Sequence, residues 1–329
     1  MAGLGSGPPV VGIDLGGTKV LAGVVSAENR ILGRGKRNTP AKEGAQAILD
    51  TIVGCVQDAL AEAKVSATDI AAAGVGSPGP LDPDSGVILF SSNLNVQNFP
   101  LGPDLAGKLN RPVLVQNDVR VGGYGEFKLG AGVGYENIIA AFVGTGIGGC
   151  LIDRGQVVTG ATGNAGEIGH IVLKAGGPKC GCGARGCMEA LASKTAIARR
   201  IDKAIRKGVP TVLREKLSKK SGRLKSGELA AAVAIGDPVA LREVHRAAHF
   251  LGLGLGSLMN VFGPEIVIIG GGVTGALGDS FVDLVRTSAR RQAIIDQEAK
   301  IKIVRAALGD DAGILGAALL ARERFLGSN

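Results

Sequence analysis

Two stretches of the sequence share one form, in which an apolar β-rich run, a glycine-rich turn and a second apolar run succeed one another. The first is VVGIDLGGTKVLAGVV at residues 10–25, and the second is IIAAFVGTGIGGCLIDRGQVV at residues 138–158. Apolar runs that are broken only by glycine indicate β-hairpins. The recurrence of such a hairpin predicts a duplicated α/β fold, in which each half is built around one sheet.

The rest of the chain supplies helices and buried strands to both halves. Helical spacing of apolar residues predicts helices, and short apolar runs predict strands. The predicted helices are 45–63, Pro238–Phe262, Leu277–Arg291 and Gly313–Phe325, and the predicted strands are Ile31–Lys36, Ile70–Gly76, Pro112–Val115 and Ile266–Ile269. A chain of 329 residues is long enough for two lobes. We expect a small N-terminal lobe at 1–118, with the C-terminal helix 312–329 packing on it, and a large lobe at 119–311.

Composition excludes several classes of protein. No apolar run approaches the roughly 20 residues that span a bilayer, and the N-terminal MAGLGSGPP lacks the features of a secretory signal. We therefore expect a cytoplasmic protein with no membrane partner. The net charge is +8, but the most basic run, Lys216–Lys225, has no aromatic residues for base stacking. It is interpreted as a solvated helix end or loop, and no nucleic-acid partner is expected.

Three glycine turns are candidates for binding phosphate, because bare backbone can approach a phosphate closely and direct N–H groups at it. They contain Gly16, Gly17, Thr18 and Lys19; Gly144, Thr145 and Gly146; and Gly270, Gly271 and Gly272. The sequence has no GxxxxGK[ST] phosphate loop. Asp14, on the first strand, is placed to hold Mg²⁺ through water beside a triphosphate, or else only to initiate the turn.

A dinucleotide-binding site is the alternative interpretation of two of these turns, because both match GxGxxG. The match at Gly144, Gly146 and Gly149 is followed by a predicted strand, whereas the fingerprint must open a helix. The match at Gly270, Gly272 and Gly275 precedes a predicted helix. A nicotinamide dinucleotide site therefore remains a minor alternative there.

Cys180, Cys182 and Cys187, in CGCGARGC, come shortly after His170 and form the strongest local motif. Glycines between the cysteines let a loop present three sulfurs to one tetrahedral ion, and a single imidazole completes the set. Four protein ligands leave no open position, so the sequence predicts a structural Zn²⁺ site. His170 can bind the metal through one ring nitrogen and offer the other to a substrate hydroxyl.

Phosphoryl transfer to an alcohol needs a carboxylate that accepts the hydroxyl proton, and Asp118, at the end of a predicted strand, is the best-placed candidate. Asn117 and Asp118 could equally cap the following helix, and the two roles are compatible. Sugar hydroxyls need fixed polar partners. Asn117, Glu167, His170 and Glu189 are of the right types, whereas Asn93 by itself is interpreted as a turn residue.

DLGGTK at 14–19, SPGP at 77–80, ND at 117–118, GTGIGG at 144–149 and EIGH with CGCGARGCME between 167 and 189 resemble the motifs of the ROK family (repressors, open reading frames and kinases). The resemblance implies an actin-like, ribonuclease-H-like pair of lobes, in which ATP phosphorylates the 6-hydroxyl of glucose in sugar metabolism. It implies Asp118 as the base, and it adds Asn93 to the sugar contacts Asn117, Glu167, His170 and Glu189. A homodimer or homotetramer is typical of the family.

Some alternatives stay open within this resemblance. The hexose could be mannose, fructose or N-acetylmannosamine, and polyphosphate could replace ATP. A sugar-responsive repressor would need a helix-turn-helix ahead of the first strand, where nine residues stand, so a kinase is expected. The sequence also departs from the family pattern, because the bulky Val119 and the basic Arg120 follow Asp118 where small residues are usual.

Overall fold

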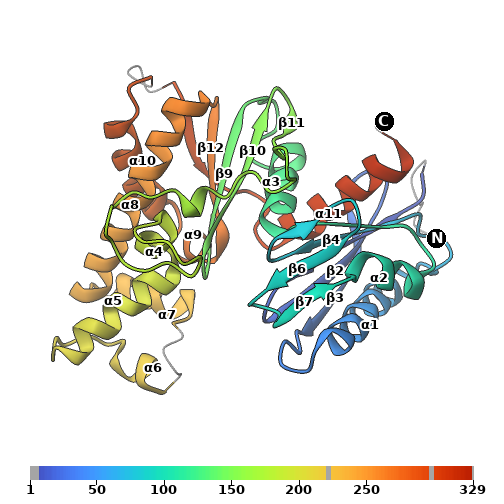
Figure 1. The fold of residues 1–329 in the computed structure, drawn as a ribbon, viewed down its shortest axis with the longest axis horizontal. Helices are drawn as coiled ribbons and strands as arrows, with labels where there is room; N and C mark the ends of the chain where they lie inside the picture. Colours follow the sequence, from blue (N-terminus) through green and yellow to red (C-terminus); the bar gives the residue numbers. More distant parts are fainter. Residues whose placement is uncertain (1–6, 220–223, 296–299, 328–329) are drawn as a thin grey trace. The chain divides into compact units, whose positions relative to one another are not determined.

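The structure is a computed structural model that describes residues 7–219, 224–295 and 300–327, and the chain forms two compact units (Figure 1). The first unit contains the described residues of Met1–Val133, Thr159–Ala165 and Asp310–Asn329, and the second contains Gly134–Val158 and Gly166–Gly309. The first unit therefore extends beyond residue 118 and takes in the helix that starts there. Residues 220–223, within the basic run Lys216–Lys225, lie outside the described residues.

Each unit contains a mixed five-stranded sheet. The first unit has strands β1 (Val10–Leu15), β2 (Lys19–Val25), β3 (Ile31–Asn38), β4 (Ala73–Ser77), β5 (Leu81–Asp82), β6 (Val87–Ser91), β7 (Val96–Phe99) and β8 (Val113–Asn117), and helices α1 (Ala45–Ala63), α2 (Leu101–Leu109), α3 (Asp118–Leu129) and α11 (Asp311–Leu326). The second has strands β9 (Ile138–Val143), β10 (Ile147–Asp153), β11 (Gln156–Val157), β12 (Ile266–Gly270) and β13 (Lys302–Arg305), the 3₁₀ turn η1 (Ile168–His170), and helices α4 (Met188–Ala192), α5 (Lys194–Arg206), α6 (Arg214–Lys219), α7 (Ser226–Ala234), α8 (Pro238–Phe262), α9 (Gly271–Leu277) and α10 (Asp279–Gln292).

The two large sheets have the same topology. Their strand orders are β3-β2-β1-β4-β8 and β11-β10-β9-β12-β13. In each, the glycine-turn hairpin pairs antiparallel, and its first strand then pairs in parallel with the next strand, β4 or β12. The duplicated α/β fold predicted from the two hairpins is therefore confirmed.

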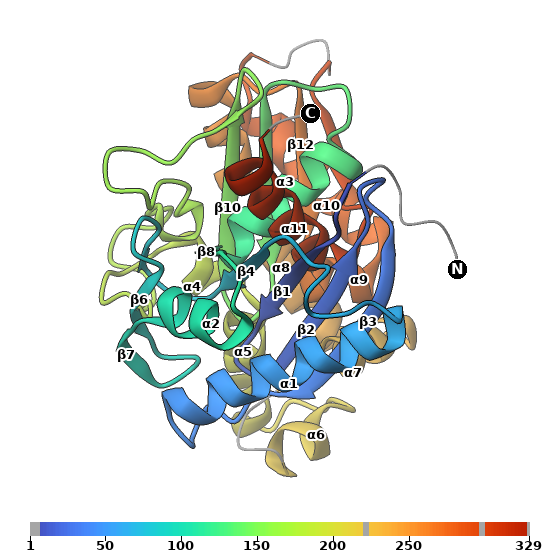
Figure 2. The ribbon, with the colours of Figure 1, turned by 90° about the vertical axis from the view of Figure 1, so that its right-hand side faces the viewer.

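In the first unit the two faces of the sheet carry different side chains. Val11 and Ile13 belong to the core that also contains Ile48 and Ile52 of α1. Gly12, which alternates with them, faces α11 on the other side, as does Gly74 of β4. A Cβ atom on Gly12 would lie 1.9 Å from the Ile314 carbonyl oxygen. Because successive strand residues face opposite sides, one apolar face holds α1 and one glycine face holds α11 (Figure 2).

The core of the second unit is built around α8, whose buried side chains join those of β9, β12, α5 and α10. Asp237 caps this helix by accepting hydrogen bonds from Val239 and Ala240 N–H, and Pro238 occupies its first turn. Gly263, with a φ of 63°, ends it. Among the described residues, no helix has the length and apolar character that a membrane span requires.

Candidate active site and metal centre

The glycine turn of the first unit lies against Asn93. Gly16 N–H donates to the Lys19 carbonyl oxygen (2.9 Å), which closes the turn between β1 and β2. A Cβ atom on Gly17 would lie 2.9 Å from the Asn93 carbonyl oxygen, so any larger residue at position 17 would displace one of the two segments. The structure thus places Asn93 beside the predicted phosphate-binding turn.

Asp14, at the end of β1, lies in an acidic environment. Burial raises the pKa of its carboxyl to about 7, and the neighbouring carboxylates of Asp118 and Asp310 act in the same direction. The start of α11 approaches Asp14 closely, since a Cβ atom on Gly313 would lie 2.8 Å from its Cγ. Asp310 and Gly313 were not predicted from the sequence, although the run GDDAG at 309–313 repeats the pairing of acids with glycine.

Asn117 and Asp118 stand where β8 becomes α3. The Asn117 Oδ1 atom accepts hydrogen bonds from Val119 N–H (3.0 Å) and Arg120 N–H (3.1 Å), so it caps the helix. The Asp118 Oδ1 atom accepts from Val119 N–H (2.9 Å). The capping interpretation is confirmed for Asn117. The same cap fixes the backbone of Asp118 at the carboxyl end of a parallel strand, where open α/β sheets bind ligands.

The glycine turn of the second unit is bound to Glu189. The Glu189 Oε2 atom accepts a hydrogen bond from Ile147 N–H (3.0 Å), and a Cβ atom on Gly146 would lie only 2.2 Å from that oxygen. On the other side, Lys194 N–H donates to the Gly144 carbonyl oxygen (3.0 Å). Thr195 donates its hydroxyl to the Thr145 carbonyl oxygen (2.7 Å). The turn is therefore held between Glu189 and the first residues of α5.

The four predicted metal ligands converge. The ligand atoms of His170, Cys180, Cys182 and Cys187 all lie within 4.8 Å of one another. The Cys182 and Cys187 sulfurs are 3.8 Å apart, and the Cys180 sulfur is 3.7 Å from His170 Nδ1. A tetrahedral Zn²⁺ with Zn–S bonds of about 2.3 Å requires sulfurs about 3.8 Å apart. The donor set and its spacing therefore fit a four-coordinate zinc ion.

The orientation of His170 agrees with a metal held through one nitrogen. Its Nδ1 faces Cys180, while its Nε2 lies 3.8 Å from Glu167 Oε2. Burial raises the pKa of the Cys180 thiol, so a bound cation would favour its thiolate. Glycines shape the loop: Gly186 has a φ of 83°, and a Cβ atom on it would overlap the Lys174 carbonyl at 1.7 Å.

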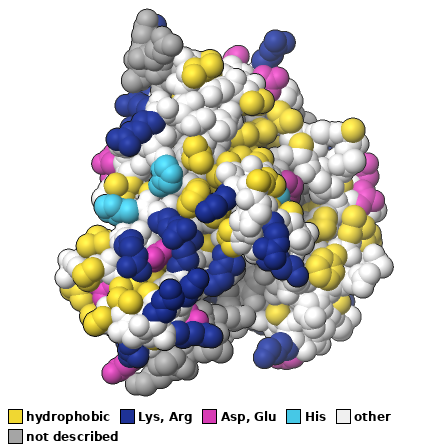
Figure 3. Space-filling model, turned by 60° about the vertical axis from the view of Figure 1, so that its left-hand side comes forward, with side chains coloured by type: hydrophobic (Ala, Val, Ile, Leu, Met, Phe, Trp, Pro, Cys, Tyr) yellow, Lys and Arg dark blue, Asp and Glu magenta, His cyan; other side chains and the backbone are white. Residues whose placement is uncertain are grey.

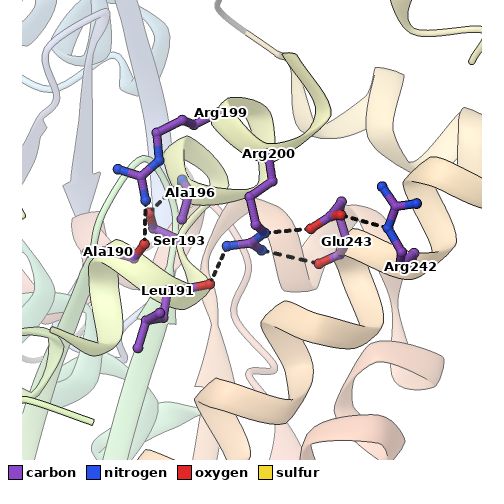
Figure 4. A network of polar contacts seen from close by, with 8 residues as sticks. All are labelled: Ala190, Leu191, Ser193, Ala196, Arg199, Arg200, Arg242 and Glu243. Atoms are coloured by element: carbon purple, nitrogen blue, oxygen red, sulfur yellow. Dashed lines mark hydrogen bonds and ion pairs between the residues drawn. The ribbon is translucent and has the colours of Figure 1, made fainter. Parts of the chain in front are cut away.

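Helix α4 begins directly after Cys187 and carries Glu189 as its second residue, and arginines hold its C-terminal end (Figure 4). Arg199 donates to the Ala190 carbonyl oxygen (2.8 Å) and Arg200 to that of Leu191 (2.7 Å). The Arg200 guanidinium also pairs with Glu243 at 2.6 Å, and their side chains are only 14% and 5% exposed. This network connects α4 to α5 and α8, and it fixes the backbone from which Glu189 projects.

Lys and Arg side chains gather on one face of the molecule (Figure 3). The exposed residues of α5 and α8 include Arg199 and Arg246.

The glycine turn after β9 and the glycine run after β12 differ in the elements that they join. The turn at Gly144–Gly146 lies between two strands, β9 and β10, as predicted. The run at Gly270–Gly272 leads from β12 directly into α9, and Gly271, with a φ of 86°, lies against the backbone of Val143 at the end of β9.

Fold and site together define a class: duplicated ribonuclease-H-like α/β proteins with a glycine-turn hairpin in each unit and a His-Cys₃ metal-binding loop. Within this class the chain belongs to the ROK family, whose model matches residues 10–324. The resemblance drawn from the motifs is thereby confirmed.

Several relatives match over nearly the whole chain. It is 35% identical to a glucokinase of Thermotoga maritima over 319 residues, which covers 97% of this chain and 98% of the relative. A ROK family glucokinase from Streptomyces griseus, solved in complex with glucose and AMPPNP, has a TM-score of 0.83 at 34% identity and covers 96% of this chain and 99% of its own. A ROK hexokinase from Thermus thermophilus has a TM-score of 0.79 at 38% identity, with coverages of 96% and 99%.

Proposed function

We propose that this protein is an ATP-dependent glucose kinase that transfers the γ-phosphoryl group of ATP to the sugar 6-hydroxyl. The observation that carries the proposal is Asp118, a carboxylate fixed at the carboxyl end of β8 in the unit that also presents the Gly16–Lys19 turn. The similarity to glucokinases, including one solved with glucose and an ATP analogue, supports both substrates.

In this proposal Asp118 accepts the proton of the 6-hydroxyl as the sugar oxygen attacks the γ-phosphorus, and ADP leaves. Asn93, Asn117, Glu167, His170 and Glu189 bind the sugar hydroxyls and orient the attacking oxygen. The proposed contacts of the nucleotide phosphates are Asp14, Gly16, Gly17, Thr18, Lys19, Gly144, Thr145, Gly146, Gly271 and Gly272. The close packing of Gly17, Gly146 and Gly271 against their neighbours supports a need for bare backbone at these turns.

Two metal ions complete the proposal. Zn²⁺ would be held by His170, Cys180, Cys182 and Cys187 and would fix the loop that carries Glu167 and Glu189. Mg²⁺, near Asp14, would neutralise charge on the transferred phosphoryl group. The cytoplasmic location and the homodimeric or homotetrameric state expected from the resemblance stay predictions.

The substitution Asp118→Asn tests the proposed base, since the amide oxygen can still accept the Val119 N–H. We expect kcat to fall by a factor of about 10² to 10⁴, the usual contribution of a general base. Glucose binding, measured by calorimetry, should stay within a few-fold of the parent value. Asp104→Asn, on α2 of the same unit, is the control. A kcat within tenfold of the parent would exclude Asp118 as the base.

The choice of substrates needs a separate assay. A coupled panel should compare glucose with mannose, fructose and N-acetylmannosamine, and ATP with polyphosphate. We expect the highest kcat/KM with glucose and ATP. A higher kcat/KM for another hexose would support a sugar kinase whose substrate is that hexose and not glucose.

A further inference from the structure

Arg120 is a buried arginine two residues after Asp118, and its residue is only 4% exposed. Its guanidinium lies away from bulk solvent and donates to three oxygens. It bonds the Gln116 side-chain oxygen (2.8 Å) and the carbonyl oxygens of Gly163 (2.7 Å) and Ala165 (2.9 Å). A planar fork of donors suits two neighbouring carbonyls in a way that a lysine ammonium does not. The basic residue that departs from the family pattern is therefore bound to fixed oxygens of its own unit.

The carbonyl groups of Gly163 and Ala165 belong to a short segment, residues 159–165, which we call the strap. The strap belongs to the first unit, whereas residues on both sides of it, through Val158 and from Gly166, belong to the second. It is closed by a hydrogen bond from Ala165 N–H to the Thr159 carbonyl oxygen (2.9 Å). Asn164 adds a long contact to the Leu81 carbonyl oxygen at 3.5 Å. Arg120 thus makes two short side-chain hydrogen bonds that hold the strap to α3.

The end of the strap constrains the position of Glu167. Two residues of chain span at most about 7 Å, so the Glu167 backbone must stay within that distance of Ala165. Ile168 N–H donates to the Gly166 carbonyl oxygen (2.7 Å), and His170 N–H to that of Glu167 (3.0 Å), so the segment from Gly166 to His170 is a tight turn with little slack. Only Gly166 separates Ala165 from Glu167, so we expect a shift of Ala165 to move Glu167.

We propose that Arg120 is a positioning residue for sugar binding, which clamps the strap and so restrains the chain that leads directly to Glu167. The inference rests on the proposed function, because it takes Glu167 as a sugar contact. The same guanidinium also bonds Gln116 of β8, the residue that precedes Asn117 and Asp118 in the chain. One side chain thereby bonds both the strand that precedes the proposed base and the strap that precedes a proposed sugar ligand.

Arg120→Met, which keeps the apolar stem and removes the donors, tests the clamp. Hydrogen exchange of peptides from residues 159–170 should become at least about tenfold faster, because the strap loses two charge-assisted hydrogen bonds. The KM for glucose should rise about tenfold or more, with the KM for ATP within about twofold, as expected when only sugar contacts are misplaced. Arg120→Lys should fall between the parent and Arg120→Met in both measurements.

Arg111→Met is the matched control. Arg111 lies in the same unit and donates to the backbone carbonyls of Ile70, Asn110 and Thr68, none of which is in the strap. It should leave strap exchange and the KM for glucose at parent values. Unchanged strap exchange in folded Arg120→Met or Arg120→Lys protein, or an equal rise in KM in the control, would overturn the proposal. If Arg120→Met speeds strap exchange but the parent protein does not phosphorylate glucose, Arg120 still holds the strap. The proposed function is then rejected.

Discussion

Between its ordinary pKa of 3.8 and its folded pKa of about 7, Asp14 holds a proton that the unfolded chain releases. Its folded pKa of about 7 lies above its ordinary value of 3.8, so the protonated carboxyl contributes stability that is fully present below pH 3.8 and lost as the pH rises through 7. Asparagine mimics the neutral carboxyl. We expect Asp14→Asn to stabilise the metal-free, nucleotide-free protein above pH 7 by up to about 4 kcal/mol, at 1.36 kcal/mol for each unit of pKa.

Urea unfolding of both proteins between pH 4 and pH 8.5 measures this effect. The difference in free energy of unfolding should grow up to pH 7 and then stay constant. Asp50→Asn, an exposed carboxylate on α1, serves as the control. A difference that does not change with pH would contradict the raised pKa of Asp14.

How far single residues could be predicted depended on how local their partners are. The metal ligands were predictable because Cys180, Cys182 and Cys187 lie within one loop whose glycines are visible in the sequence. Asp310 and Gly313 were not, because they meet Asp14 only through the packing of α11 on β1. Arg120 was noticed as a departure, but its partners in the strap come 43 and 45 residues later, and no periodicity connects them.

Among the elements, we expect the loop between η1 and α4 to depend on the proposed metal, because its short turns enclose little apolar side chain. The small buried cluster there consists of Cys180, Cys187 and Ala190. We expect Cys182→Ser to lower zinc content from about one ion per chain and to destabilise the protein by several kcal/mol, since structural zinc contributes directly to folding. The measurement is metal analysis combined with thermal unfolding.

The control for this prediction is chelation. Once zinc is removed from both proteins, the difference in unfolding temperature between the parent and Cys182→Ser should disappear, because the lost interaction is then absent from each. A difference that persists without metal would mean that Cys182 stabilises the loop by packing. Full zinc content in the variant would exclude Cys182 as a ligand.

The bounds of two helices were predictable, although only α8 has a strong side-chain cap, since Gly44 before α1 makes none. Helices α1 and α8 begin and end at the predicted residues, and α8 has Asp237, Pro238 and Gly263 at its ends. The helix predicted at Leu277–Arg291 is α10, which begins two residues later, at Asp279, because Gly278, with a φ of 69°, separates it from α9. A glycine between two apolar helical stretches permits either a continuous helix or a break, and tertiary packing decides between them.

At the scale of the whole molecule, the glycine face of the first sheet makes α11 indispensable. Gly12→Ala places a methyl group 1.9 Å from the Ile314 carbonyl oxygen, so the helix must move outward. We expect a loss of about 1–3 kcal/mol in the free energy of unfolding, which is typical of an overpacked core. Gly107→Ala, within α2, has nothing within 4 Å of the new methyl group and should be neutral or stabilising. Equal stabilities of the two variants would contradict this tight packing.

The position of α11 in the sequence has a consequence for biosynthesis. The helix completes the first unit, but it comes after the entire second unit in the sequence. While the ribosome makes residues 134–309, the glycine face of β1 and β4 has no helix to cover it. The amino-terminal part of the chain therefore reaches its final packing only after the second unit has been translated. Synthesis begins with the first unit, but the second unit can be completed before it.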